Sequence, residues 1–296
     1  MITLHFAGYQ PARSVHTRAL HALRDRVAEC SGGTLAITVT DSIVTLGRKA
    51  ADLLTMVESG ELDGCYFASS YLAGRVPALG VFDRPFQADS RQASFAALDG
   101  DPGASIAERV ADATAFRVLG YWDNGIRHIS NGVRPIRSPA DCVGVTLRTL
   151  DNAQHQDAFH RLGFMPIYID VADLPRAVAE GMVDAQENPL TNIVNFGLHA
   201  RHRHVSLTGH LLGVALLLVN RARFDALPAE PRSALVDAAK ASETLQRSLA
   251  IAEDADCLRL LADAGVAVIG PEAIDLRAFR ALAGAEPSVT PTKAAT

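Results

Sequence analysis

A strand, a helix and a second strand follow one another within the first forty residues, and this order limits the fold more than any other feature of the sequence. Apolar and polar residues alternate over residues 2–6 and 35–39, as in half-buried β-strands. Between them Ser14 is a suitable helix N-cap and Gly32 a suitable stop. The apolar face of that helix comprises Val15, Ala19, Leu23 and Val27. Because a helix between two strands favours parallel pairing, we predict an α/β protein with a mainly parallel sheet.

A similar arrangement occurs in the second half of the chain. Residues 138–141, Ser-Pro-Ala-Asp, form a good helix start, and the apolar strand 145–147 follows, with Arg148 at its carboxyl end. Residues 60–64 (GELDG) and 181–185 (GMVDA) also resemble each other, and each leads from a helix-ending glycine into a strand. These echoes indicate two related halves.

One long helix is predicted near the end of the chain. Residues 228–265 are rich in Ala, Leu and Glu, with no proline after Pro231 and no glycine before Gly265. Such a helix would be roughly 45–50 Å long, more than one lobe requires, so we expect it to span two lobes. The last residues, 285–296, are rich in Pro, Thr and Ala and predict a disordered tail.

Charge and hydropathy argue against nucleic acid and membrane-spanning segments. The 296 residues carry a formal net charge of −5, so an anionic ligand would need a local basic pocket. The longest apolar stretch, Leu211 to Val219, is far shorter than the ~20 residues of a spanning helix. The chain enters strand 2–6 directly after Met1, without the pattern of a signal peptide. It is therefore either cytoplasmic or a mature form from which a signal peptide was removed.

No familiar catalytic or metal motif is present. The sequence lacks G-x-S-x-G, G-x-G-x-x-G, G-x-x-x-x-G-K-[ST] and H-E-x-x-H, and we predict no cofactor and no catalytic residue. The cysteines are scattered, and we expect mostly buried free thiols, with one disulfide as the alternative: Cys30, Cys65, Cys142 and Cys257. Four histidines between residues 199 and 210 could suggest a metal site. The interleaved Arg201 and Arg203 would repel a cation, so we expect a solvated surface segment and no metal.

Three polar residues fall where an open α/β sheet binds its ligand, beyond the carboxyl ends of strands. Arg148 follows strand 145–147, Asn188 follows a strand near residues 183–187, and Arg127 lies in an expected turn over residues 122–127. Two guanidinium forks and an amide could hold a carboxylate. Each residue also has a simpler interpretation: an arginine there is more often a surface residue or part of an internal ion pair, and Asn188 before Pro189 could merely shape a turn.

Several motifs together resemble the DctP-type solute receptors of tripartite ATP-independent periplasmic (TRAP) transporters. They cover about residues 2–270 and are specific in combination. The main ones are WDNGIRH at 122–128, PIRSPAD at 135–141, VGVTLR at 143–148, LGFMPI at 162–167 and GMVDAQENPL at 181–190. The resemblance implies an α/β, two-lobed periplasmic-binding-protein-like fold with a ligand cleft between the lobes, crossing hinge strands and a long lobe-spanning helix. Lobe I would contain residues 1–125 and about 212–250, and lobe II residues 126–211 and about 251–284.

The resemblance also assigns roles to residues. Arg148 matches the principal carboxylate-binding arginine of the family, Arg127 its second arginine, and Asn188 the asparagine that completes the clamp. Less well-defined first-lobe positions, including the loop around residues 46–49, are expected to select the rest of the solute. They are Gln10, His16, Ser70, Tyr71 and Lys49.

Two departures from the family pattern bear on the solute. Val171 stands where many relatives have an aromatic residue, and Arg48 or Lys49 where they commonly have a glutamate. A standard sugar-acid ligand is therefore in doubt, and the sequence suggests a less polar body.

The resemblance implies a periplasmic, monomeric receptor, not an enzyme. It would capture a small organic acid and deliver it to the membrane subunits of a TRAP transporter, without a nucleic-acid partner. Two alternatives stay open: the ligand-sensing domain of a signalling system, and a cleft enzyme with His16 or His128 as general base.

Overall fold

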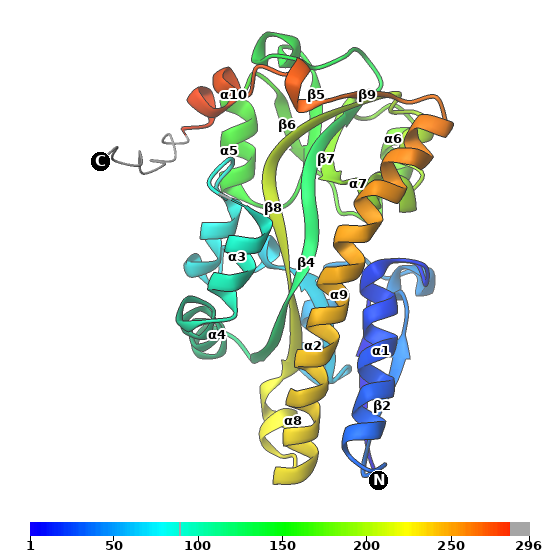
Figure 1. Ribbon diagram of the computed structural model, residues 1–296, viewed down its shortest axis with the longest axis vertical. Helices are drawn as coiled ribbons and strands as arrows, with labels where there is room; N and C mark the ends of the chain where they lie inside the picture. Colours follow the sequence, from blue (N-terminus) through cyan, green and yellow to red (C-terminus); the bar gives the residue numbers. More distant parts are fainter. Residues whose placement is uncertain (89, 285–296) are drawn as a thin grey trace, which may run out of the picture.

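The computed structural model of the protein describes residues 1–88 and 90–284, and the predicted disordered tail, residues 285–296, lies outside them. Within these residues helices cover both sides of one mixed sheet (Figure 1). The strands are β1 (Ile2–Ala7), β2 (Leu35–Thr40), β3 (Gly64–Ala68), β4 (Phe116–Asn131), β5 (Thr146–Thr149), β6 (Met165–Tyr168), β7 (Ala185–Pro189), β8 (His204–Asn220) and β9 (Ala267–Ile269). The helices are α1 (Val15–Cys30), α2 (Asp52–Ser59), α3 (Arg91–Leu98), α4 (Asp101–Ala113), α5 (Ala153–Arg161), α6 (Leu174–Ala179), α7 (Leu190–Asn195), α8 (Arg221–Asp225), α9 (Ala229–Asp263) and α10 (Leu276–Ala283).

The sheet consists of two similar halves joined by two long strands. Its order is β2-β1-β3-β8-β4-β7-β5-β6, with β9 beside β8. In lobe I, β1 pairs in parallel with β2 and β3, and β3 is antiparallel to β8. In lobe II, β5 pairs in parallel with β6 and β7, and β7 is antiparallel to β4. The repeated pattern explains the two similar pentads, because Gly60 and Gly181 both have positive φ and precede the equivalent strands β3 and β7.

The expectation of a mainly parallel sheet holds for each βαβ unit but not for the centre. There β4 and β8 run antiparallel through both lobes and are the crossing strands of the fold (Figure 1). The apolar stretch over residues 211–219 is part of β8, buried between its neighbours, which accounts for its composition.

The predicted turn at residues 122–127 is wrong, because β4 continues through it with an irregularity in its pairing to β8 between Asp123 and Ile126. Gly125 has a φ of 84° at this irregularity, and a Cβ atom there would lie 2.6 Å from Cβ of Pro189 in β7. Only glycine fits this close approach, so the glycine that suggested a turn instead allows β4 and β7 to meet.

Helix α9 spans both lobes, as predicted. Its 35 residues correspond to about 52 Å, and it packs against α1 in lobe I and against α7 and β9 in lobe II (Figure 1). Gln246 fastens it to β4 near the crossing: its side chain accepts from Asp123 N (2.7 Å) and donates to Asp123 O (2.7 Å).

Separate apolar cores stabilise the two lobes. One large cluster contains Phe6, Leu23 and Trp122, whereas smaller clusters in the other lobe surround Phe159 and Leu174. This separation agrees with two lobes, and the residue boundaries given above stay a prediction.

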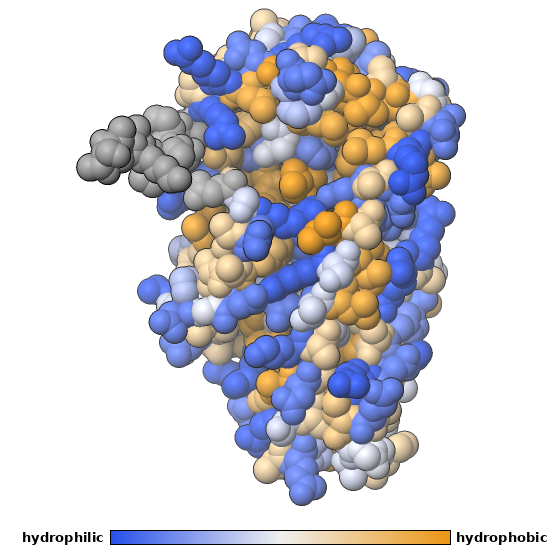
Figure 2. Space-filling model, in the orientation of Figure 1, coloured by the Kyte–Doolittle hydropathy of each residue, from blue (hydrophilic) through white to orange (hydrophobic). Residues whose placement is uncertain are grey.

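The outer surface of α9 mixes hydrophilic and hydrophobic side chains. On the face in Figure 2 hydrophobic side chains gather mainly over lobe II, which is the upper lobe in this view, and hydrophilic ones are spread over the rest. None of the helices in the described part of the chain combines the length and the apolar character needed to cross a membrane.

Local predictions were mostly confirmed. Helix α1 begins after the N-cap Ser14, whose side chain accepts from Thr17 N, and residues 138–141 form a capping box at a short 3₁₀ helix. The thiols of Cys65, Cys142 and Cys257 are buried, and none of the four cysteines is in a disulfide.

Candidate functional site

Arg148 is a buried cation that forms no ion pair within the described residues. It lies within β5, one residue before the strand's last residue and not beyond its end as predicted. Its side chain is 0% exposed; Nε donates to the carbonyl of Ile169 (2.7 Å), whereas Nη1 and Nη2 have no partner among the described residues. An uncompensated charge in the interior is costly, so this guanidinium lacks an anion. The simpler interpretations, a surface residue or an internal ion pair, do not describe it.

Arg127 is buried as well, but its charge is balanced. From β4 its Nε donates to Oε2 of Glu187 in β7 (2.6 Å), and its Nη2 donates to Oε1 of the same carboxylate (2.9 Å). Although burial opposes ionisation of Glu187, Arg127 and His210 hold the pKa of that carboxyl well below its usual range. For this arginine the interpretation as an internal ion pair is correct. Arg127 can contact a solute only through N–H groups that the ion pair does not use.

Asn188 lies inside β7, at the centre of a chain of amides. Its Oδ1 accepts from Arg127 Nη2 (3.3 Å) and from Asn192 Nδ2 (3.0 Å). The next amide, Gln10 in the other lobe, donates through Nε2 to Asn192 Oδ1 (3.2 Å). Because Arg127 can only donate, it fixes the orientation of every amide along this chain. Asn188 thus couples the arginine to lobe I.

The first-lobe residues differ in how they relate to Arg148. The hydroxyl of Tyr71 is buried and makes no hydrogen bond within the described residues; burial raises its pKa, and the nearby Arg148 opposes the rise. Burial lowers the pKa of His16 to about 3, and neither ring nitrogen has a hydrogen-bond partner in the described part of the chain. By contrast, Ser70 is occupied by a hydrogen bond to Asp83 (2.5 Å). Lys49 is exposed.

The sequence analysis missed several polar groups of the same region. Besides Oε1 of the predicted residue Gln10, the structure leaves buried atoms without a hydrogen-bond partner among the described residues at Asp170 Oδ2, Asn124 Oδ1, Ser69 Oγ and Trp122 Nε1. Asp170 follows β6, so the strand-end rule that pointed to Arg148 would also have found it. Glu187 has no such signal, because its importance depends on Arg127, sixty residues away.

Direct contacts close the two lobes over this region. Besides the bond between Gln10 and Asn192, Arg13 donates to Asn195 Oδ1 (2.9 Å) and to its carbonyl (3.0 Å). Asp83 accepts from Asn152 (2.8 Å), and its Oδ1 lies 2.9 Å from Nε2 of His155. A cavity of about 10 Å³ remains beside Arg127 and His155, which is room for about one water molecule.

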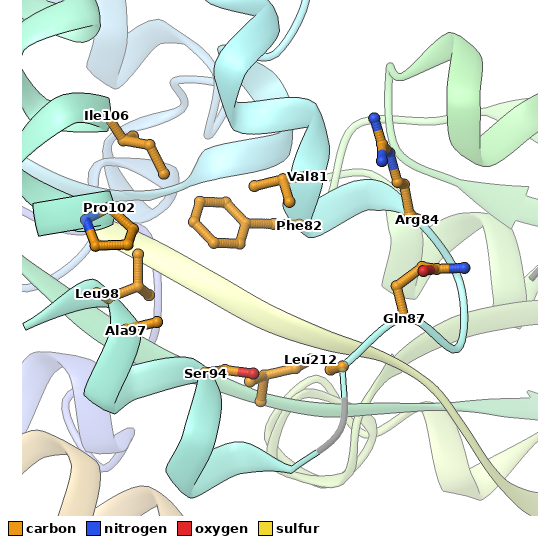
Figure 3. A pocket seen from close by; sticks show the side chains of 11 residues that line it. Val81, Phe82, Arg84, Gln87, Ser94, Ala97, Leu98, Pro102, Ile106 and Leu212 are labelled. Atoms are coloured by element: carbon orange, nitrogen blue, oxygen red, sulfur yellow. The ribbon is translucent and has the colours of Figure 1, made fainter. Parts of the chain in front are cut away.

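A larger hollow lies outside this region. It has a volume of about 230 Å³ and is lined mostly by apolar side chains of lobe I, including Phe82, Leu98 and Ile106, with Arg84 and Gln87 on one side (Figure 3). None of the predicted site residues lines it. Without convergent polar groups it does not fit an organic anion.

The histidine segment was predicted incorrectly. His202 and His210 are 2% and 1% exposed, whereas Arg201 and Arg203 are exposed. His210 Nε2 lies 3.3 Å from Glu187 Oε2, so it belongs to the network around Arg127. Within the described residues no three His, Cys, Asp or Glu side chains are grouped to hold a metal ion.

Comparisons with known proteins show the family of the chain. Residues 6–286 match DctP, described as bacterial extracellular solute-binding protein, family 7. The chain belongs to this family. A DctP-family relative, a solute-binding protein of Verminephrobacter eiseniae, is 33% identical over 72% of this chain and 63% of its own length. The 2,3-diketo-L-gulonate-binding periplasmic protein of Escherichia coli is 30% identical over 79% of this chain and 70% of its own length.

A solved structure extends the similarity to the whole DctP fold. The TRAP periplasmic solute-binding protein of Roseobacter denitrificans, with bound β-D-glucuronate, has a TM-score of 0.89 and 27% identity. The match covers 95% of this chain and 91% of that one. The predicted two-lobed α/β fold and the predicted family are therefore confirmed.

Proposed function

We propose that the protein is the extracytoplasmic receptor of a TRAP transporter, which captures a small organic acid between its lobes and delivers it to the membrane subunits. In this proposal it works as a periplasmic monomer, without a cofactor or a nucleic-acid partner, and releases the acid unchanged. Support comes from the DctP family match, from the periplasmic relative in E. coli and from the glucuronate-bound structure of R. denitrificans.

The observation that carries the proposal is the free fork of Arg148. Its two Nη atoms are buried and unpartnered, and a planar guanidinium matches a carboxylate with two parallel hydrogen bonds. Arg127 already has Glu187 as its counterion, so Arg148 is the arginine whose hydrogen-bonding fork is left for a carboxylate. The Tyr71 hydroxyl, whose pKa burial raises and the nearby Arg148 lowers, is a further hydrogen-bonding group for that carboxylate.

Binding and closure are coupled through the lobe contacts. When the lobes open, water can hydrate Arg148. When they close, Gln10 and Arg13 form hydrogen bonds to Asn192 and Asn195 of α7, and the water leaves. A carboxylate on Arg148 stabilises the closed state because it replaces the lost hydration, and the ion pair is stronger in the dry site. The solute thereby selects the conformation offered to the membrane subunits.

Thermal unfolding in the presence of organic acids tests the proposal. An acid at 100 times its dissociation constant adds about 2.7 kcal/mol to the free energy of unfolding, which raises the melting temperature clearly. Such an acid should fail to stabilise Arg148→Met. If no carboxylate in a broad library stabilises the wild-type protein, the receptor proposal is wrong.

Whether the protein releases the acid unchanged is tested separately, by recovering the bound acid and recording its NMR spectrum. Neither histidine of the enzyme alternative supports turnover by its contacts in the described structure: His16 has no hydrogen-bond partner, and His128 Nδ1 accepts from the backbone of Gly209.

Reconstitution with TRAP membrane subunits in proteoliposomes should give solute uptake only when the receptor is added. Uptake that is independent of the receptor would contradict delivery.

A further inference from the structure

One more segment of the chain passes between the lobes, in addition to β4, β8 and α9. Leu79 and Phe95 belong to the large apolar core of lobe I. Phe86 lies between them in the sequence but belongs to the core cluster of Phe159 in lobe II, and it is only 7% exposed. Residues 83–88, which we call the strap, therefore carry an aromatic side chain from one lobe into the core of the other.

The strap is bound to lobe II by three kinds of contact. At its start, Asp83 accepts a hydrogen bond from Nδ2 of Asn152, the N-cap residue of α5 (2.8 Å). Three residues later the backbone N of Phe86 donates to the carbonyl of His210 in β8 (2.7 Å). The guanidinium of Arg280 in α10 lies over the ring of Phe86, 5.4 Å from its centroid. These contacts fix both the ring and the backbone of Phe86.

The backbone of Phe86 is strained in this position. Its φ is 62°, and among the described residues it is the only one other than glycine with a positive φ. A bulky side chain adopts the left-handed conformation only where its surroundings require it, because its Cβ approaches the following carbonyl oxygen too closely. Here the bond to His210 and the buried ring require it. Release of both contacts would allow the backbone to relax.

Separation of the lobes would strain these contacts further. Phe82 packs against the lobe I core and precedes Phe86 by four residues, which can span at most about 14 Å. Phe82 moves with lobe I, whereas the site that holds the ring of Phe86 moves with lobe II. So short a connection limits how far the lobes can separate while both side chains stay in their cores.

We propose that the strap is a strained latch: the Phe86 ring enters lobe II only when the lobes close, and its backbone then takes the left-handed conformation. Burial of the ring favours the closed state, and the backbone strain opposes it. The latch therefore strengthens closure around a solute without closing the empty receptor by itself. This proposal rests on the proposed receptor function and describes how its closed state is regulated.

Fluorine NMR of the whole chain tests the latch directly. One sample carries para-fluorophenylalanine in place of Phe86, and the control carries it in place of Phe116, which is 0% exposed in the lobe I core. Without solute, the fluorine at position 86 should be exposed, so its resonance should differ between light and heavy water, whereas that of the control should not. Addition of pyruvate, succinate or D-glucuronate, whichever stabilises the wild type most, should abolish this difference.

Each other outcome of this measurement is decisive. A fluorine at position 86 that stays buried without solute, or stays exposed with a bound solute, overturns the latch. An exposed fluorine at position 86 in a protein that no acid of a broad library stabilises would support the latch and contradict the receptor function.

Two substitutions separate the ring from the strain. Phe86→Ala removes the buried ring, so it should weaken solute binding about ten- to 100-fold, mainly through faster dissociation. Phe86→Gly should bind about three- to tenfold tighter than Phe86→Ala, because glycine takes a positive φ without strain. The control is Ala88→Gly, at an exposed strap residue without a positive φ, which should bind like the wild type.

The melting temperature distinguishes the latch from a merely structural role of Phe86. If Phe86→Ala has a lower melting temperature but binds the solute within threefold of the wild type, the ring contributes to stability alone and the latch is refuted. Equal affinities of Phe86→Ala and Phe86→Gly would refute the role of the strain.

Discussion

Replacing Arg148 by methionine separates the binding role of this residue from any role in stability. Methionine has a similar unbranched stem, so it can fill most of the space of the arginine's aliphatic part in this fully buried position. The substitution removes the two unpartnered Nη atoms and one hydrogen bond, from Nε to the carbonyl of Ile169.

The expected loss of affinity follows from the missing hydrogen bonds. Two bonds from a charged donor to a carboxylate contribute about 1.5–3 kcal/mol each, and losing both costs roughly 3–5 kcal/mol of binding. Since every 1.4 kcal/mol is about tenfold, the dissociation constant should rise by about 10²–10⁴. The free energy of unfolding without solute should change by no more than about 1 kcal/mol, because the lost Ile169 bond is offset by removal of an unpaired charge.

The assay is calorimetric titration of the acid that stabilises the wild type most. Arg176→Met is the control, because Arg176 is exposed on α6 and makes only surface ion pairs. Arg148→Lys should lie between the two, because an ammonium keeps the charge but not the planar fork. Affinity of Arg148→Met within tenfold of wild type, with both proteins folded, would refute the role of Arg148 as the carboxylate's main partner.

Three further outcomes follow from the same structure. Glu187→Gln leaves Arg127 buried without its counterion, so urea unfolding should show a loss of about 3–5 kcal/mol; a loss under about 1 kcal/mol would contradict the pairing. Burial lowers the pKa of His16 to about 3, so below pH 6.5 the unfolded chain takes up its proton first, and stability falls as the pH drops. Between pH 7 and pH 5 the wild-type protein should lose about 2 kcal/mol of its free energy of unfolding through His16, and His16→Gln should not show this loss. Equal dependence of stability on pH in the two proteins would argue against this role of His16. Gly125→Ala should cost about 2–4 kcal/mol in chemical denaturation because of strain and a clash with β7, whereas Gly144→Ala, with positive φ but open space, should cost about 1 kcal/mol; equal costs would dismiss the clash.

The sequence predicts those parts of the fold whose causes are local. Helix starts and extents follow from nearby residues in three cases: the N-cap at Ser14, the capping box at residues 138–141 and the glycine-free stretch before Gly265. Glycines 60 and 181 predict equivalent strand entries for the same reason. Helix positions and the repeated βαβ units were therefore predictable.

Features that depend on distant contacts were not predictable from local patterns. Gly125 looks like a turn residue, and only its approach to Pro189 in β7 shows that the strand continues. The state of Arg127 depends on Glu187, and the burial of His210 depends on the same carboxylate. The family resemblance supplied Arg127, Arg148 and Asn188 as candidates, but not which of the two arginines carries an unbalanced charge.

The expectation of a less polar solute stays a prediction. Val171 and the basic loop residues 48–49 suggested a less polar solute, because an acidic residue seemed to be missing. The structure places an acidic side chain, Asp170, against the backbone of Ala50, next to that loop.

The unpartnered groups also explain why the closed state should depend on solute. Closing an empty site strips water from Arg148, Asp170 and Gln10, and against this cost it forms the hydrogen bonds between the lobes, such as those of Arg13, Gln10 and Asp83. Each buried group without a partner costs about 1–3 kcal/mol, and a charged one more, which exceeds the ~1 kcal/mol of a typical lobe contact. A solute that satisfies all three groups at once reverses this balance, whereas one that satisfies Arg148 alone reverses only part of it. Selectivity for the solute and control of closure therefore arise from the same atoms.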